Sequence, residues 1–142
     1  MMYLVDTNVL SEARRNSNEA RTWLRSIDPA AIYLSVITLG EIMKGIALKA
    51  QTDTRAAASL TIWLEQLRVD HGDRILPISD DVALAWGRLA AERPRSMADG
   101  LIAATAAVHG KIIVTRNVGD FADIGVSVIN PWDAEAGSSP RD

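Results

Sequence analysis

Short runs rich in β-forming residues alternate with helical patterns along this 142-residue chain. The runs that we expect to be strands are residues 2–5, 32–35, 74–77, 111–115 and 126–129. The segments between them carry apolar residues at the spacing of amphipathic helices. Strands that alternate with helices form a parallel sheet, because each connection crosses back over a face of the sheet. We therefore predict an α/β fold, with a mostly parallel five-stranded sheet between two layers of helices.

The composition indicates one globular domain. Hydrophobic residues make up 48% of the chain and charged residues 23%, which excludes a disordered protein, and the lack of cysteine excludes disulfides and thiolate metal sites. The first Gly/Ser-rich stretch is at residues 134–142, so we expect a domain at 1–133 and a loose tail at 134–142. Without a signal peptide or a long apolar run, the chain is expected to be cytoplasmic and to have no membrane partner.

Four acidic residues stand where elements of this predicted fold begin or end. They are Asp6 after the first strand, Glu41 in the helical segment after the second, Asp99 before the apolar stretch 101–108, and Asp120 after the fourth strand. The carboxyl ends of parallel strands share one edge of a sheet, where open α/β folds bind ligands. Carboxylates gathered there would repel one another unless a hard cation lay between them. That arrangement suits magnesium-assisted phosphodiester hydrolysis and predicts a nuclease.

Three of these acids also have a purely structural explanation. Asp6 could cap the turn that it begins with Thr7 and Asn8, and Asp99 could cap the helix predicted to begin near residue 97. Glu41 falls nearly opposite the apolar stripe of its helix, as an ordinary exposed residue would. The residues alone leave these readings open.

The net charge of −3 does not exclude a nucleic-acid substrate. If a metal neutralises the four acids, the 15 Lys and Arg face the 14 that remain of the 18 acids, so the rest of the surface is about +1. Candidate phosphate contacts near the acids are Arg14, Arg15, Lys44, Arg93, Arg95 and Arg116. For any single one, a solvated surface charge is the simpler explanation.

Four ordered motifs resemble those of PIN-domain ribonucleases. They are Asp6-Thr7-Asn8-Val9-Leu10-Ser11-Glu12, Ser35-Val36-Ile37-Thr38-Leu39-Gly40-Glu41-Ile42, Asp99-Gly100-Leu101-Ile102-Ala103-Ala104-Thr105-Ala106, and Thr115-Arg116-Asn117 followed by Asp120-Phe121. More specifically, the chain is similar to VapC toxins of type II toxin-antitoxin modules, and its Ser11-Glu12 and Asn130-Pro131-Trp132 resemble the FitB-like branch. The resemblance covers residues 2–132 and implies a PIN-like three-layer α/β/α sandwich.

The resemblance also implies a site. Asp6, Glu41, Asp99 and Asp120 fall on the family's acidic quartet, which binds Mg²⁺ or, as a substitute, Mn²⁺. Asp6 and Asp99 would be direct ligands, and Glu41 and Asp120 would act directly or through water. The supporting positions are Thr7, Asn8, Thr115, Arg116 and Asn117. Because the family varies between Asn and Asp at the position of Asn117, either Asn117 or Asp120 could complete the site.

The implied function is that of a toxin endoribonuclease. The expected partners are an RNA substrate, a cognate VapB-like antitoxin that covers the acidic pocket, a second copy of the chain, and operator DNA reached only through the antitoxin. The products would carry a 5′-phosphate and a 3′-hydroxyl.

Other classes fit the residues less well. A haloacid-dehalogenase phosphatase needs a second Asp where this chain has Asn8, and a receiver-like signalling domain needs a lysine after its last strand, whereas Lys111 precedes its strand. A catalytically degenerate PIN domain that serves as an RNA-binding or interaction module is kept as the alternative.

Overall fold

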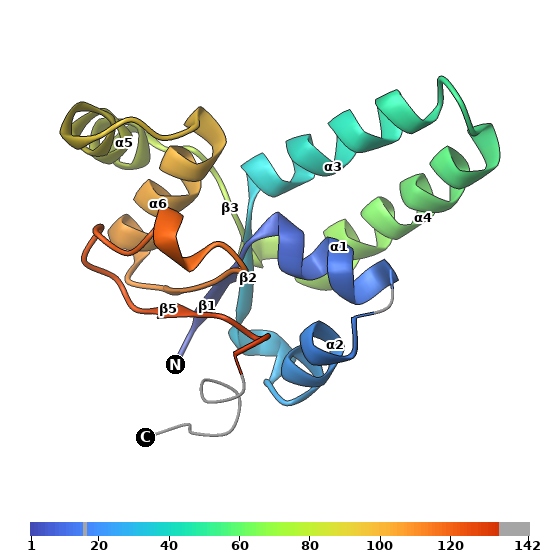
Figure 1. Ribbon diagram of the computed structural model, residues 1–142, viewed down its shortest axis with the longest axis horizontal. Coiled ribbons are helices and arrows are strands. Elements are labelled where there is room, and N and C mark those ends of the chain that lie inside the picture. Colours follow the sequence, from blue (N-terminus) through green and yellow to red (C-terminus); the bar gives the residue numbers. More distant parts are fainter. Residues whose placement is uncertain (16, 134–142) are drawn as a thin grey trace.

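A five-stranded parallel sheet forms the centre of the molecule, whose computed structural model describes residues 1–15 and 17–133 (Figure 1). The strands are β1 (Tyr3–Val5), β2 (Ile32–Ser35), β3 (Ile75–Leu76), β4 (Ile112–Val114) and β5 (Val128–Ile129). Their order in the sheet is β3-β2-β1-β4-β5, and every pairing is parallel. Each strand lies within its predicted range, and some end residues belong to turns instead, as Arg74 does.

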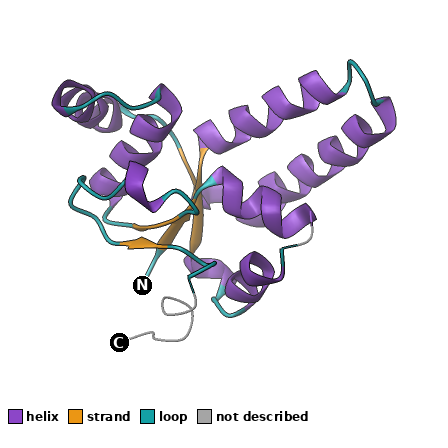
Figure 2. Ribbon diagram, in the orientation of Figure 1, coloured by secondary structure: helices purple, strands orange, loops and turns teal. Residues whose placement is uncertain are grey.

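Within the described residues, six helices cover the two faces of this sheet (Figure 2). They are α1 (Thr7–Arg15), α2 (Asn18–Arg25), α3 (Val36–Lys49), α4 (Thr54–His71), α5 (Asp80–Glu92) and α6 (Met97–His109), joined in places by the short 3-10 turns η1 (Pro29–Ala31), η2 (Gly72–Arg74) and η3 (Val118–Asp120). Helices α1 to α4 lie on one side, and α5 and α6 lie on the other (Figure 1). The predicted three-layer α/β/α architecture is confirmed.

Alternation along the strands divides the core into two parts. Val5 and Val114 pack with α1 to α4, whereas their neighbours Leu4 and Ile113 pack with α6 and Phe121. Successive side chains of a strand point to opposite faces, so two adjacent apolar residues supply both layers. This explains why the strands read as continuous apolar runs rather than as alternating ones.

Helix α6 is the most buried helix on its side of the sheet, as its composition predicts. Residues 102–106 are all buried, and Thr105 satisfies its hydroxyl by donating to the Leu101 carbonyl at 2.7 Å. The helix begins at the Ser96 cap, whose Oγ accepts the Asp99 N–H at 3.1 Å, and it ends at Gly110 in the left-handed conformation. This burial fixes the first turn of α6, and therefore Asp99, against the sheet.

Helices α3 and α4 form a long hairpin that extends away from the sheet (Figure 1). Its inner face is buried through Ile42, Ile46 and Leu64, whereas Leu48 and Ile62 are exposed. The hairpin begins directly after β2, where Ser35 Oγ accepts the Ile37 N–H at 3.0 Å. Glu41 consequently lies at the base of the hairpin, near the sheet.

The tail predicted at 134–142 lies outside the described residues, and the domain boundary at residue 133 stays a prediction. In the part of the chain that the structure describes, the helices are too short or too polar to cross a membrane.

The packing of α5 on α6 generates a test of the core. A Cβ added at Gly100 would lie 2.8 Å from Trp86 Cδ1, whereas the described residues place no such neighbour within 4 Å of Gly87 in α5. Gly100→Ala should therefore lower the free energy of unfolding by about 1–3 kcal/mol through overpacking. Gly87→Ala should raise it by about 0.4–1 kcal/mol by restricting the unfolded chain. Urea unfolding of both variants checks this, and equal effects would contradict it.

Candidate active site

The site lies at the carboxyl ends of β1 and β4, where the order of the strands reverses direction. Strands β2 and β3 follow on one side of β1, and β4 and β5 lie on the other. Open parallel sheets bind ligands at this switch point. The Asp6 N–H donates to the Val114 carbonyl at 2.8 Å, so the residues that follow the two strands begin side by side.

Asp6 is buried and is held by its neighbours. Only 5% of the surface of Asp6 is exposed. The Thr115 hydroxyl donates to Oδ2 at 2.8 Å, the Thr7 N–H donates to Oδ1 at 2.8 Å, and Asn8 Nδ2 donates to Oδ2 at 3.3 Å. The turn-capping explanation thus holds in part, because Asp6 accepts one backbone N–H. The Thr115 bond, however, ties it across the sheet and fixes its direction.

Burial raises the pKa of Asp6 from 3.8 to about 6. The hydrogen bonds from Thr115 and Thr7 lower the pKa, and the carboxylates of Asp99 and Glu41 raise it further. The structure therefore brings three of the four predicted acids into electrostatic contact. A desolvated carboxylate that lies near two others is a candidate for a functional site.

Glu41 is exposed, as its helical phase predicts, but it is not an unattached surface residue. The Thr7 hydroxyl donates to Glu41 Oε1 at 2.6 Å and also lies 3.0 Å from the hydroxyl of buried Thr38. Thr38 was not among the predicted site residues. A polar residue one helical turn before Glu41, between the apolar residues Ile37 and Leu39, was the signal that could have identified it.

Asp99 does not cap helix α6, so the capping explanation for this residue is wrong. Ser96 is the cap, and Asp99 lies in the first turn with its side chain available for other contacts. The positive end of the helix dipole stabilises an anion at this position. The Asp99 carboxylate is one of the two that raise the pKa of Asp6.

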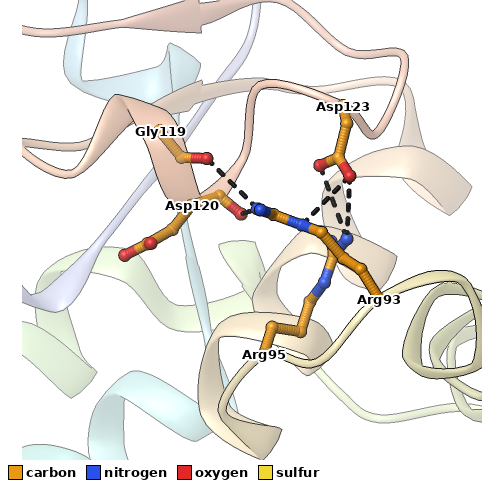
Figure 3. A network of polar contacts seen from close by, with 5 residues as sticks. All are labelled: Arg93, Arg95, Gly119, Asp120 and Asp123. Atoms are coloured by element: carbon orange, nitrogen blue, oxygen red, sulfur yellow. Dashed lines mark hydrogen bonds and ion pairs between the residues drawn. The ribbon is translucent and has the colours of Figure 1, made fainter.

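Asn117 directly precedes the short turn η3, and Asp120 is its last residue. Asp120 is exposed, and Figure 3 shows its carboxylate directed away from Arg93 and Arg95. It is not among the groups that shift the pKa of Asp6. The backbone N–H of Asn117 donates to Thr115 Oγ1 at 3.0 Å. The contacts therefore do not decide between these two residues as the fourth member of the site.

Asn8 and Arg116 support the site from the β4 side. Asn8 Oδ1 accepts the Arg116 N–H at 3.2 Å, so it bridges the residues that follow β1 and β4. The Arg116 guanidinium stacks over Trp132 at 4.6 Å, a partner that the sequence did not reveal. This cation–π contact holds the guanidinium of the residue that directly follows Thr115.

The donor set suits a hard divalent cation, although its ligands are not preassembled. Among residues 1–15 and 17–133, no three His, Cys, Asp or Glu side chains are already grouped as a metal site. The carboxylates of Glu41 and Asp99 nonetheless both raise the pKa of Asp6, and no basic side chain is among the groups that shift it. Oxygen ligands of this kind fit Mg²⁺ or Mn²⁺, which would relieve the repulsion.

A pocket of about 470 Å³ opens beside these acids, between α1 and the α3–α4 hairpin. Thr7 and Glu41 line its end, and its walls carry Arg14, Arg15, Lys49 and Trp63. The Arg14 guanidinium is held at 5.5 Å from the centre of the Trp63 ring, and its Nη2 donates to Ser59 Oγ at 2.9 Å. The predicted phosphate contacts Arg14 and Arg15 thus border the site.

The same prediction is wrong for Arg95. Its side chain is only 3% exposed and pairs with Asp123, and Arg93 also pairs with Asp123 and donates to two backbone carbonyls. Both guanidinium groups face protein because acceptors that are distant in sequence lie beside them.

Comparison with known proteins gives a consistent result. The family described as PIN domain matches residues 3–126. Toxin FitB of Neisseria gonorrhoeae is 35% identical over 92% of this chain and 99% of its own length, and VapC ribonuclease Y4jK of Sinorhizobium fredii is 32% identical over 93% and 99%. In the crystal structure of FitAcB from Neisseria gonorrhoeae, a chain that is 35% identical superimposes with a TM-score of 0.85, over 92% of this chain and 99% of that one.

The raised pKa of Asp6 predicts that its ionisation lowers the free energy of unfolding of the metal-free protein. In the unfolded chain Asp6 ionises near pH 3.8 and in the folded chain near pH 6, so its stabilising contribution is complete below pH 3.8 and is lost by about pH 6. Asp6→Asn should therefore be more stable than the wild type at pH 7 by about 1–3 kcal/mol, and the difference should shrink toward pH 4.

Urea unfolding in EDTA between pH 4 and 7.5 measures this difference. Asp73→Asn, at an exposed acid in η2, serves as the control and should show no such trend. A difference between Asp6→Asn and the wild type that does not vary with pH would contradict the expectation.

Proposed function

Because this chain belongs to the PIN domain family, with the FitB toxin and a VapC ribonuclease as relatives over nearly their full length, we propose that it is the toxin of a VapBC-type module. Its activity would be that of a Mg²⁺-dependent endoribonuclease. The observation that carries the proposal is the buried Asp6, whose pKa is raised to about 6 beside Asp99 and Glu41 at the switch point of the sheet.

The four acids fall into two pairs in the proposed metal site. Asp6 and Asp99 would bind Mg²⁺ directly, and Glu41 and Asp120 would bind it directly or through water. A bound divalent cation supplies a water of lowered pKa and offsets the charge that builds on the phosphate oxygens. Thr115 and the Thr7 N–H hold Asp6 in one orientation, and the Thr7 hydroxyl does the same for Glu41. Mn²⁺ should substitute for Mg²⁺.

The basic side chains beside the acids suit an RNA backbone. Arg14, Arg15 and Lys49 line the pocket beside Glu41, and Arg116 directly follows Thr115, whose hydroxyl holds Asp6. Positive charges on both sides of a metal site can hold the phosphates that flank the bond to be cut. Attack by water on the phosphorus would leave a 5′-phosphate and a 3′-hydroxyl.

The proposed partners are those that membership of this family implies. A cognate VapB-like antitoxin would cover the acidic pocket with a basic side chain and would carry the binding of operator DNA. The toxin would act as a homodimer in the cytoplasm.

Cleavage of RNA is the first test. The purified protein should cut a structured RNA with Mg²⁺ or Mn²⁺, and Asp6→Asn or Asp99→Asn should lower the rate at least about 100-fold, because each removes a charged ligand. Gel analysis of the products gives the rate, and circular dichroism checks that the fold is retained.

Asp73→Asn, which removes an exposed acid away from the site, should cut at the wild-type rate. Cutting that persists in excess EDTA would disprove the metal-dependent mechanism. A well-folded wild type that binds RNA but does not cut it with either metal would favour the degenerate, non-catalytic PIN domain.

Growth arrest is the second test. Expression of the chain alone should stop cell growth, and expression with the product of an adjacent small reading frame should restore it, because the antitoxin would block the acidic site. Asp6→Asn should be harmless at equal protein levels. A toxic Asp6→Asn variant would separate the growth effect from nuclease activity and would contradict the proposal.

A further inference from the structure

Arg93, Arg95 and Asp123 form a cluster that the proposed function has not used (Figure 3). Arg93 Nε lies 3.0 Å and Arg95 Nη2 lies 3.2 Å from the same oxygen, Asp123 Oδ2. Arg95 Nη2 also donates to Oδ1 at 3.4 Å. One carboxylate thus joins both arginines of the α5–α6 linker to the segment after η3, and we call these three residues the arginine clamp.

The clamp also grips the turn that carries Asp120. Arg93 Nη2 donates to the carbonyl oxygens of Gly119 and Asp120, at 3.1 Å in each case. Figure 3 shows that the Asp120 carboxylate extends from the opposite side of this turn, away from the arginines. Arg93 therefore fixes the backbone of Asp120 and leaves its carboxylate to face elsewhere.

Pro94 explains why both arginines reach the same partner. A residue before proline is driven into an extended conformation, and Arg93 has φ −161° and ψ 155°. In an extended segment, residues two apart project to the same side. The sequence Arg93-Pro94-Arg95 is thus suited to present two guanidinium groups to one acceptor.

Stability alone does not account for this arrangement. The Arg95 side chain is 3% exposed and lies against the first turn of α6, where its Cδ is 3.7 Å from the position of a Cβ on Gly100. Its Nε and Nη1 are buried and have no hydrogen-bond partner within residues 1–15 and 17–133. Burying a guanidinium whose hydrogen bonds are incomplete costs desolvation energy. Apolar residues at a buried position often give a more stable fold than such a charged group.

We propose that Arg93 is a positioning residue for the metal site. By holding the carbonyls of Gly119 and Asp120, it sets the place and direction of the Asp120 carboxylate, and the Asp123–Arg95 pair anchors it to α6. This inference rests on the proposed function, because it assigns Asp120 a part in holding the metal. Groups that orient a metal ligand typically change affinity or activity by about 10-fold to 100-fold.

The test is a double-variant cycle of Arg93→Ala and Asp120→Asn. The readouts are kcat and KM for RNA cleavage with Mg²⁺, Mn²⁺ affinity by calorimetry, and the Tm of each variant. Arg93→Ala should weaken Mn²⁺ binding or lower kcat about 10-fold or more, and the same change in the Asp120→Asn background should have little effect. Residues that act as a unit are non-additive in this way. Arg88→Ala, at an exposed arginine of α5, is the control and should match the wild type.

Two results would overturn the inference. One is an effect of Arg93→Ala that is equally large with and without Asp120→Asn, which would show a general structural role. The other is an Arg93→Ala variant that matches Arg88→Ala in both kcat and Mn²⁺ affinity. If Arg93→Ala does not fold, Arg93→Lys is judged by the same criteria, because it keeps the charge but loses the planar fork of donors.

The outcomes also separate this inference from the proposed function. If cutting by the wild type depends on Asp6 and either overturning result is found, the proposed nuclease function stands and the positioning role of Arg93 is rejected. A wild type that neither cuts RNA nor binds Mn²⁺ overturns both.

Discussion

The hydrogen bond between Thr115 and Asp6 is the contact on which the arrangement of the site depends. It joins the residues that follow β1 and β4, 109 positions apart, and it holds a carboxylate in a place where burial disfavours its charge. A side chain kept in such a place needs neighbours that fix it, and Thr7 and Asn8 provide further bonds. Burying Asp6 lowers the stability of the fold, and interactions elsewhere in the fold offset this loss, which is typical of sites shaped for binding.

The neighbouring acids are reached from separate layers of the molecule. Glu41 comes from the base of the α3–α4 hairpin on one face of the sheet, and Asp99 comes from the first turn of α6 on the other. Asp6 lies between them at the end of β1. These groups therefore come together only when both helical layers are in place. The site depends on the fold of the whole domain rather than on one motif.

Much of this could be predicted from the sequence, because apolar runs and helical spacing act locally. The five strands, helix α6 and the position of Asp6 after β1 follow from the order of elements, and the positions of Glu41 and Asp99 follow from the motifs. The partners of Arg93 and Arg95 could not be predicted, since an arginine near an acidic motif looks the same whether it faces solvent or a distant carboxylate such as Asp123. Thr38 and Trp132 were missed for the same reason: their roles depend on tertiary contacts with Thr7 and Arg116.

The division of the core between adjacent strand residues has a consequence for how the chain must fold. Leu4 belongs to one half of the core and Val5 to the other, and β1 pairs with β4 through Leu4 with Ile113 and Val5 with Val114. A slip of one residue between these strands would exchange the two apolar faces and would also move Asp6 away from the Thr115 hydroxyl. Misalignment of the strands and loss of the acidic centre are thus a single error, so a molecule with a well-packed interior has also assembled its chemistry.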